Sequence, residues 1–151
     1  MRKIEIRGSE QTPKIVLNPK SGNIKILGRS TMTCPHEFYP TIIKMLQNYL
    51  DSPVEKTQLF IDLEYYNTLS SRYILSILKL VSRINSLEGK SSKIFWYFDE
   101  EDYGIRRDIK VFSELINYKI HEIEYDYSTV ISSKNNQVSP PLPMCHSGQT
   151  P

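Results

Sequence analysis

Three hydroxyl side chains, Thr68, Ser70 and Ser71, follow an apolar segment at 59–63 and precede a helical pattern. They are the residues of this chain whose type and placement best suit chemistry. The apolar segment predicts a strand, and a helix that begins directly after a strand leaves its first backbone N–H groups without partners inside the helix. Two roles follow from this position. Asn67 or Thr68 can cap the helix, or a hydroxyl can carry a phosphate, which the positive end of a helix stabilises.

Two carboxylates at the end of the same predicted strand offer a second kind of chemistry. Asp62 and Glu64 lie two residues apart, so they share one face of a strand and could act as an acid and base pair. The sequence has no P-loop, no GxGxxG fingerprint and no GxSxG nucleophile motif. The three histidines, His36, His121 and His146, lie in a predicted helix start, an edge strand and a tail, and none pairs in the sequence with a likely nucleophile. We therefore expect no enzymatic activity and keep an enzyme that uses these carboxylates as the minor alternative.

Cysteine and histidine occur together twice, as Cys34 with His36 and as Cys145 with His146. Structural zinc sites take four such ligands, commonly with CxxC spacing, and neither pair has that spacing. The second pair also falls in a segment with the composition of a tail. The sequence thus predicts no metal site and no bound cofactor.

The composition is that of a soluble globular protein of one domain. The chain has 151 residues, of which 39% are hydrophobic and 24% charged, and this length can bury one sizeable core. The net charge of +2 and the alternation of charge signs argue against a nucleic-acid partner. No apolar run approaches the ~20 residues of a membrane span, and no apolar signal segment opens the chain. We expect a cytoplasmic protein with no membrane partner.

Strand and helix patterns alternate along the chain and indicate an α/β fold. The expected strands are 4–6, 14–17, 24–27, 57–63, 93–98 and 119–125, and the expected helices are 36–50, 69–87 and 103–116. The second and third strands flank a turn-rich loop and predict a hairpin. The nearly continuous apolar run at 57–63 predicts a central strand covered on both faces. The order favours a mixed, mostly parallel sheet with an N-terminal hairpin and with helices packed on it.

Residues 132–151 differ in composition from the rest of the chain. They contain four prolines and almost no side chains suited to a core. Too few apolar groups are present to offset the entropy of ordering this segment. We expect one domain over residues 1–131 and a disordered tail over residues 132–151.

Four motifs occur in order between residues 10 and 116. They are TPKI at 12–15 with SG at 21–22, GRS at 28–30 with FYP at 38–40, YYNTLSSR at 65–72, and WYFDEED at 96–102. Together they resemble the opening hairpin, the GRS turn, the YFNTSSSK-type motif and the WYYDxDD segment of the SiaC family of bacterial regulatory phosphoproteins. Since four separate motifs agree in order and spacing, the resemblance is specific.

The resemblance implies a single domain like the STAS domain of anti-anti-sigma factors, and a role in partner switching. In that scheme a serine/threonine protein kinase phosphorylates one hydroxyl, and a metal-dependent protein phosphatase removes the phosphate. The unmodified form binds a signalling target, which for the best known member is a diguanylate cyclase. The alternative is a STAS-like domain that senses a small molecule, and a deep apolar pocket near Trp96 and Tyr97 would favour it.

The resemblance implies phosphorylation of Thr68, because this residue occupies the position of the motif threonine. Ser70 and Ser71 are rival acceptors in the same turn. The partner-binding residues implied by the same motif are Tyr65, Tyr66, Asn67, Leu69, Ser70, Ser71 and Arg72. Phosphate at a helix start is tolerated by the fold, whereas a partner docked there would have to desolvate it. Arg72 could pair with the phosphate, and of the two tyrosines we expect one to pack inward and one to be exposed.

The tail leads to a first prediction. Deletion of residues 132–151 should leave the melting temperature nearly unchanged, because the segment adds little apolar contact to the domain. Thermal unfolding of the full and shortened chains, followed by circular dichroism, measures this. A fall of more than about 5 °C, which corresponds to roughly 1 kcal/mol for a domain near this size, would show that the tail stabilises the body.

Overall fold

Within residues 1–125, the part of the chain that the computed structural model describes, six strands form one mixed sheet in the order of the sequence. The strands are β1 (Ile4–Ile6), β2 (Lys14–Asn18), β3 (Asn23–Ser30), β4 (Lys56–Tyr66), β5 (Ser91–Asp99) and β6 (Ile120–Tyr125). The helices are α1 (Pro35–Leu50), α2 (Thr68–Ser82) and α3 (Tyr103–Ile116), with a 3₁₀ turn, η1 (Arg83–Ser86), directly after α2. The predicted tail lies outside the described residues.

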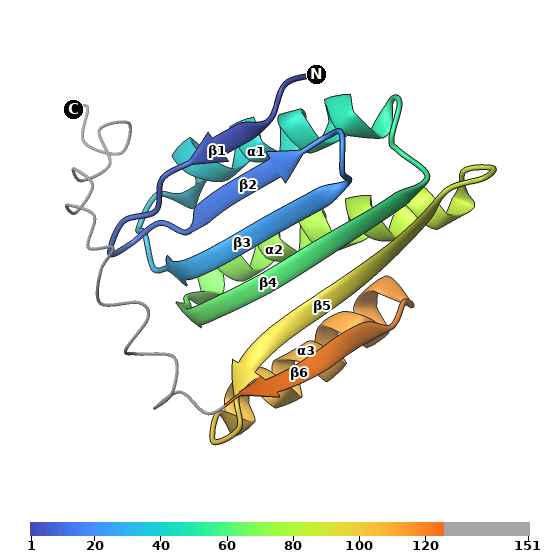
Figure 1. Ribbon diagram of the computed structural model, residues 1–151. Coiled ribbons are helices and arrows are strands. Elements are labelled where there is room, and N and C mark those ends of the chain that lie inside the picture. Colours follow the sequence, from blue (N-terminus) through green and yellow to red (C-terminus); the bar gives the residue numbers. More distant parts are fainter. Residues whose placement is uncertain (126–151) are drawn as a thin grey trace.

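The sheet changes character between its two halves. β1, β2 and β3 pair antiparallel, whereas β3, β4, β5 and β6 pair parallel. Each parallel connection runs through a helix, and Figure 1 shows α1, α2 and α3 together behind one face of the sheet. The predicted α/β fold with a mixed sheet, an N-terminal hairpin and packed helices is confirmed.

The hydrophobic core lies between the sheet and the helices. In β4, Leu59, Ile61 and Leu63 are buried, and the residues between them are only half-buried. α2 supplies the opposing wall through Ile74, Ile77, Leu78 and Val81, which are fully or almost fully buried. The prediction that the central strand is covered on both faces is wrong for the described residues, because every described helix lies on the same side (Figure 1). The apolar character of a β4 side chain that faces away from the helices therefore does not mean that the side chain is buried.

β4 is longer than its apolar run predicted, and this moves the turn that carries the hydroxyls. β3 continues to pair with β4 as far as Tyr65 and Tyr66, past a register shift between Gly28 and Arg29. Both tyrosines therefore belong to the strand, and only Asn67 separates β4 from α2. The α-helix ends at Ser82 instead of residue 87, since the last predicted turns are a 3₁₀ turn.

β4 and β5 separate toward their carboxyl ends. Their pairing stops at Ile61 opposite Trp96, although both strands continue, and Figure 1 shows β5 turning away from β4. Aromatic rings fill the space behind the opening: Trp96 stacks on Phe112 of α3 at 5.5 Å between ring centroids, and Tyr66 lies 6.0 Å from Trp96. This separation lets α3 approach the start of α2.

None of the helices in residues 1–125 has the length and apolar character that crossing a membrane requires.

The turn between β2 and β3 requires a glycine. Gly22 has a φ of +75°, donates its N–H to the carbonyl of Asn18 at 2.9 Å and accepts from the N–H of Gln58 at 2.9 Å. A Cβ on Gly22 would lie 2.2 Å from the carbonyl oxygen of Lys56. The hairpin is therefore held against β4 by a backbone contact that leaves no room for a side chain.

We predict that Gly22→Ala lowers the free energy of unfolding by more than about 2 kcal/mol, because it adds a backbone clash to the strain of a positive φ. Gly89→Ala is the matched control. Gly89 has a φ of +70° and nothing within 4 Å of a built Cβ, so only the conformational strain of about 1 kcal/mol remains. Urea unfolding of the two variants measures the difference, and equal losses would contradict the close approach.

Candidate functional site

Asn67 is the residue that caps α2. Its side-chain oxygen accepts from the backbone N–H of Ser70 at 2.9 Å, and its side-chain nitrogen donates to the carbonyl of Met32 at 2.9 Å. Its own backbone N–H donates to the carbonyl of Ser30 at 3.0 Å. Of the two cap candidates, Asn67 thus takes the role, and Thr68 becomes the first residue of the helix with an exposed side chain.

A buried chain of hydroxyl groups fixes the start of α2 to β3 and α1. Ser30 Oγ donates to Ser70 Oγ at 2.8 Å, and Ser70 Oγ donates to the carbonyl of Ser30 at 3.0 Å. Tyr39 Oη lies 2.6 Å from Ser30 Oγ. Since a serine hydroxyl has one proton and that of Ser30 goes to Ser70, Tyr39 is the donor in this contact. Burial raises the pKa of Tyr39 to about 12, so the phenol keeps its proton.

The three sequence-predicted hydroxyls therefore differ in access. Ser70 is fully buried, and Ser71 is half-buried with its Oγ donating to the carbonyl of Thr68 at 2.6 Å. Thr68 is exposed. The structure places Ser70 inside the fold. We therefore assign it a structural role at the start of the helix, and not a direct contact with a partner or a modifying enzyme.

The two tyrosines before the turn point in different directions, as the sequence predicted. Tyr65 is 61% exposed. Tyr66 packs against Trp96 and Phe112, and its Oη donates to the Asp108 carboxylate of α3 at 2.5 Å. Burial, followed by the contact with the Asp108 carboxylate, raises the pKa of Tyr66 far above that of an ordinary tyrosine. Tyr66 thus ties the end of β4 to α3, and Tyr65 is left on the surface.

A pocket of about 310 Å³ lies between the start of α2 and α3. Its lining residues are Tyr66, Asn67, Thr68, Ser71, Asp108, Val111 and Phe112. Among its lining residues Val111 is 48% exposed, and two exposed apolar residues are close to lining residues in the chain: Leu69, which follows Thr68, is 50% exposed, and Leu115, four residues after Val111, is 58% exposed. We call Tyr65, Thr68, Leu69, Val111 and Leu115 the Thr68 surface. Soluble proteins seldom cluster large exposed apolar side chains in this way without a binding role.

The α3 side of this surface was missed from the sequence. Val111 and Leu115 are four residues apart and share one face of α3, whereas the core-facing residues are Ile105, Ile109 and Phe112. A second apolar stripe beside a complete core-facing stripe was the signal that could have found them.

Trp96, proposed as the wall of a ligand pocket, is fully buried in the ring cluster instead.

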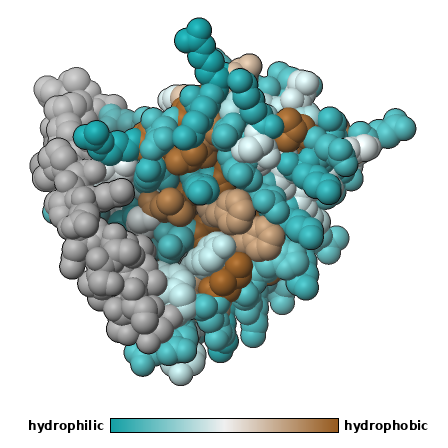
Figure 2. Space-filling model, viewed as in Figure 1, coloured by the Kyte–Doolittle hydropathy of each residue, from teal (hydrophilic) through white to brown (hydrophobic). Residues whose placement is uncertain are grey.

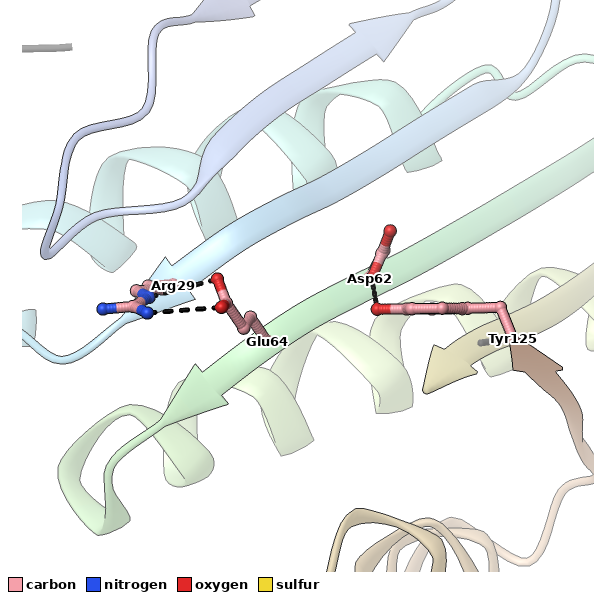
Figure 3. Close-up of polar contacts among 4 residues, drawn as sticks. All are labelled: Arg29, Asp62, Glu64 and Tyr125. Carbon is pink, nitrogen blue, oxygen red and sulfur yellow. Dashed lines mark hydrogen bonds and ion pairs between the residues drawn. The ribbon is translucent and has the colours of Figure 1, made fainter. Parts of the chain in front are cut away.

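Asp62 and Glu64 lie together on the face of the sheet that the helices leave open, but each has its own partner (Figure 3). Arg29 donates to both oxygens of Glu64, at 3.1 and 3.2 Å. Tyr125 Oη donates to Asp62 at 2.8 Å. The first contact joins the neighbouring strands β3 and β4, and the second joins β4 to β6, with β5 between them in the sheet order. Within residues 1–125 no three His, Cys, Asp or Glu side chains gather as metal ligands, and Cys145 and His146 lie outside the described residues.

Fold and site together define a class: an α/β domain with helices on one face of its sheet and an exposed threonine at the start of a capped helix. Residues 6–125 match the model of the SiaC family regulatory phosphoproteins, and the chain belongs to this family. The resemblance drawn from the four sequence motifs is confirmed.

Solved structures agree with this fold. The structure of SiaC of Pseudomonas aeruginosa superposes with a TM-score of 0.73 at 21% identity and covers 83% of this chain and 100% of the other. The structure of diguanylate cyclase SiaD of the same organism in complex with its activator SiaC matches with a TM-score of 0.73 at 20% identity, covering 81% of this chain and 99% of the other. The comparison with curated proteins gives no match.

The buried hydroxyl chain leads to a prediction that separates the two serines of the turn. Ser70→Ala should lower the free energy of unfolding by about 1–3 kcal/mol, because it removes two buried hydrogen bonds and leaves polar groups of Ser30 without partners. Ser71→Ala should cost less than about 0.5 kcal/mol, since its contact is local and partly exposed. Urea denaturation followed by tryptophan fluorescence measures both. Similar losses for the two variants would contradict the network.

Proposed function

We propose that this protein is a non-enzymatic phospho-switch that is reversibly phosphorylated on Thr68. In its unmodified form it binds and controls a signalling partner, a diguanylate cyclase. The observation that carries the proposal is the contrast within one helical turn: Thr68 is exposed at the helix start, whereas Ser70 is buried and Asn67 is committed to the cap. Family membership and the complex of P. aeruginosa SiaC with SiaD support the class of function and of partner.

The fold accommodates a phosphate on Thr68 without rearrangement. A phosphothreonine carries nearly two negative charges at neutral pH, and the start of α2 is the positive end of the helix dipole. Arg72 lies four residues further on an exposed position of α2. Residues four apart on a helix are neighbours, so its guanidinium is within reach of the phosphate. Phosphorylation therefore changes the surface and leaves the core as it is.

The same phosphate would oppose a docked partner. The Thr68 surface offers exposed apolar side chains near the threonine: Leu69 follows it in the chain, Tyr65 comes three residues before it, and Val111 lines the same pocket. A partner that covers these side chains also covers Thr68, and a phosphate there would have to lose its hydration. Tyr66 and Asn67 position the surface from within, and the exposed residues make the contacts. The switch thus acts by desolvation and needs no second conformation of the protein.

The cycle requires two enzymes besides the target, a serine/threonine protein kinase and a metal-dependent protein phosphatase. We place these reactions in the cytoplasm, with no nucleic acid or membrane as a partner.

A second candidate function, binding of a small molecule, is favoured by one observation, the pocket beside Thr68. Its volume of about 310 Å³ is at the lower end of the range for ligand sites, and its Asn67, Ser71 and Asp108 side chains are polar. A ligand there would compete with the partner.

Phosphopeptide mapping tests the acceptor. After incubation with the kinase and ATP, wild type should carry one phosphate, on Thr68, and Thr68→Ala should carry none, because the remaining hydroxyls of the turn are buried or half-buried. Ser71→Ala is the control and should be phosphorylated like wild type. Phosphate found on Ser71 and absent from Thr68 would refute the assignment.

Calorimetry with the cyclase tests the switch with the same variants. Thr68→Ala should bind like wild type, whereas Thr68→Asp and the phosphorylated protein should bind more weakly, by about 1–3 kcal/mol. Thr41→Asp is the matched control, since Thr41 is exposed on α1 and receives the same change of charge. A phosphorylated protein that binds as tightly as wild type would remove this surface from the mechanism.

A further inference from the structure

The face of the sheet that the helices leave open carries a row of side chains in register across five strands. The row consists of Val16, Lys25, Phe60, Phe95 and His121, one from each of β2 to β6. Its rings stack on one another: the centroids of Phe60 and Phe95 are 5.4 Å apart, and those of Phe95 and His121 are 5.1 Å apart. A single apolar side chain on a sheet surface is ordinary, but a stacked row is not.

A second row lies next to the first, toward the carboxyl ends of the parallel strands. Tyr97 of β5 pairs with Ile123 of β6, and on the other side of the separation between β4 and β5, Leu27 of β3 pairs with Asp62 of β4. Figure 2 shows apolar residues gathered in the middle of this face, with hydrophilic residues around them. We call the two rows together the open-face patch. A contiguous apolar patch rimmed by polar side chains is typical of a surface that binds another protein.

On β4, β5 and β6 the charges of this face are sorted by sign along the strand direction. Lys56 and Lys93 lie at the amino ends of β4 and β5, and Lys119 directly precedes β6. Lys93 lies two residues before Phe95 and Lys119 two residues before His121, and burial, then Lys119 and Lys93, lower the pKa of His121. At the carboxyl ends lie Asp62 and Glu64 of β4 and Asp99 of β5, with Glu64 paired to Arg29. Over β4 to β6 the face is therefore basic at the amino ends of the strands and acidic toward their carboxyl ends, whereas Glu5, Lys14 and Arg29 of β1 to β3 mix both signs.

We propose that a second copy of this chain docks on the open-face patch, sheet on sheet, about a twofold axis that crosses the strands. Rotation about such an axis reverses the strand direction, so the basic half of one copy meets the acidic half of the other. An axis along the strands would bring like charges together. With the axis between the two rows, Phe95 lies opposite Tyr97 of the partner subunit, and Lys93 lies opposite Asp99 of the partner subunit.

The charge pattern disfavours other occupants of the same face. A nucleic acid or an anionic membrane needs positive potential over the whole contact, and the acidic half would repel it. The contact is also small: six strands spaced ~4.8 Å apart, with about six residues each, present roughly 600 Å² per copy, which is below the ~800 Å² of a standard interface. The dimer is therefore weak and depends on concentration.

Sedimentation velocity of the full chain over a concentration series tests this proposal with a charge-reversal design. Lys93→Glu and Asp99→Lys should each raise the dissociation constant of the homodimer at least about tenfold, because each puts like charges opposite one another twice. An equimolar mixture of the two variants should dimerise again, since both contacts then join opposite charges. This recovery also shows that Asp99→Lys, which loses a hydrogen bond from the N–H of Glu101, still folds. Lys110→Glu, exposed on α3 on the other side of the sheet, should dimerise like wild type.

Three outcomes would overturn the proposal. The first is a wild-type chain that stays monomeric at every concentration. The second is a mixture of the two variants that dimerises no better than either alone, which would refute the proposed axis. The third is a lysine cross-link between Lys93 and Lys134 within one chain at monomeric concentration, which would assign the face to residues 126–151. Thr68→Asp should leave dimerisation unchanged, so this test is independent of the phospho-switch.

Discussion

The buried contact among Ser30, Tyr39 and Ser70 is the constraint on which the site depends. Each residue comes from a different element, β3, α1 and α2, and each is buried to 0% exposure. In an apolar interior a hydroxyl without a partner costs free energy, so the three groups stabilise only the one arrangement in which all are satisfied. That arrangement sets where α2 begins, and with it the position and direction of Thr68.

The cap at Asn67 completes this arrangement from outside the core. Its side chain contacts the helix through Ser70 and the segment after β3 through Met32, so the turn is held at both ends. The Thr68 side chain makes none of these contacts. A change in its charge therefore leaves the start of the helix fixed. In the proposed switch, these rigid surroundings would let one exposed hydroxyl report its chemical state to a partner without a rearrangement of the fold.

Much of the fold could be predicted from the sequence because helical and strand periodicity directly reflect which side chains face the core. α3 begins and ends where its pattern predicted, at Tyr103 and Ile116. β4 was predicted too short, because Tyr65 and Tyr66 are held in the strand by pairing with β3 across a register shift, a long-range effect. The burial of Ser70 was equally hidden, since Ser30, the partner of its hydroxyl, lies 40 residues away in the sequence. The second side of the pocket depends on the separation of β4 and β5, which only the packed rings reveal.

Within the described residues, the position of Val111 and Leu115 on α3 separates two properties that many binding surfaces combine. The groups that define the cap and the hydroxyl chain lie in β3, in α1, at the start of α2 and in the short segments before α1 and α2, whereas these two apolar side chains lie on a different helix and are exposed. In the proposed switch, exchange of Val111 or Leu115 should change which partner fits and leave the response to phosphate intact. Such a division would insulate paralogous signalling circuits in one cell from one another, and it would let orthogonal pairs be engineered by recoding α3 alone.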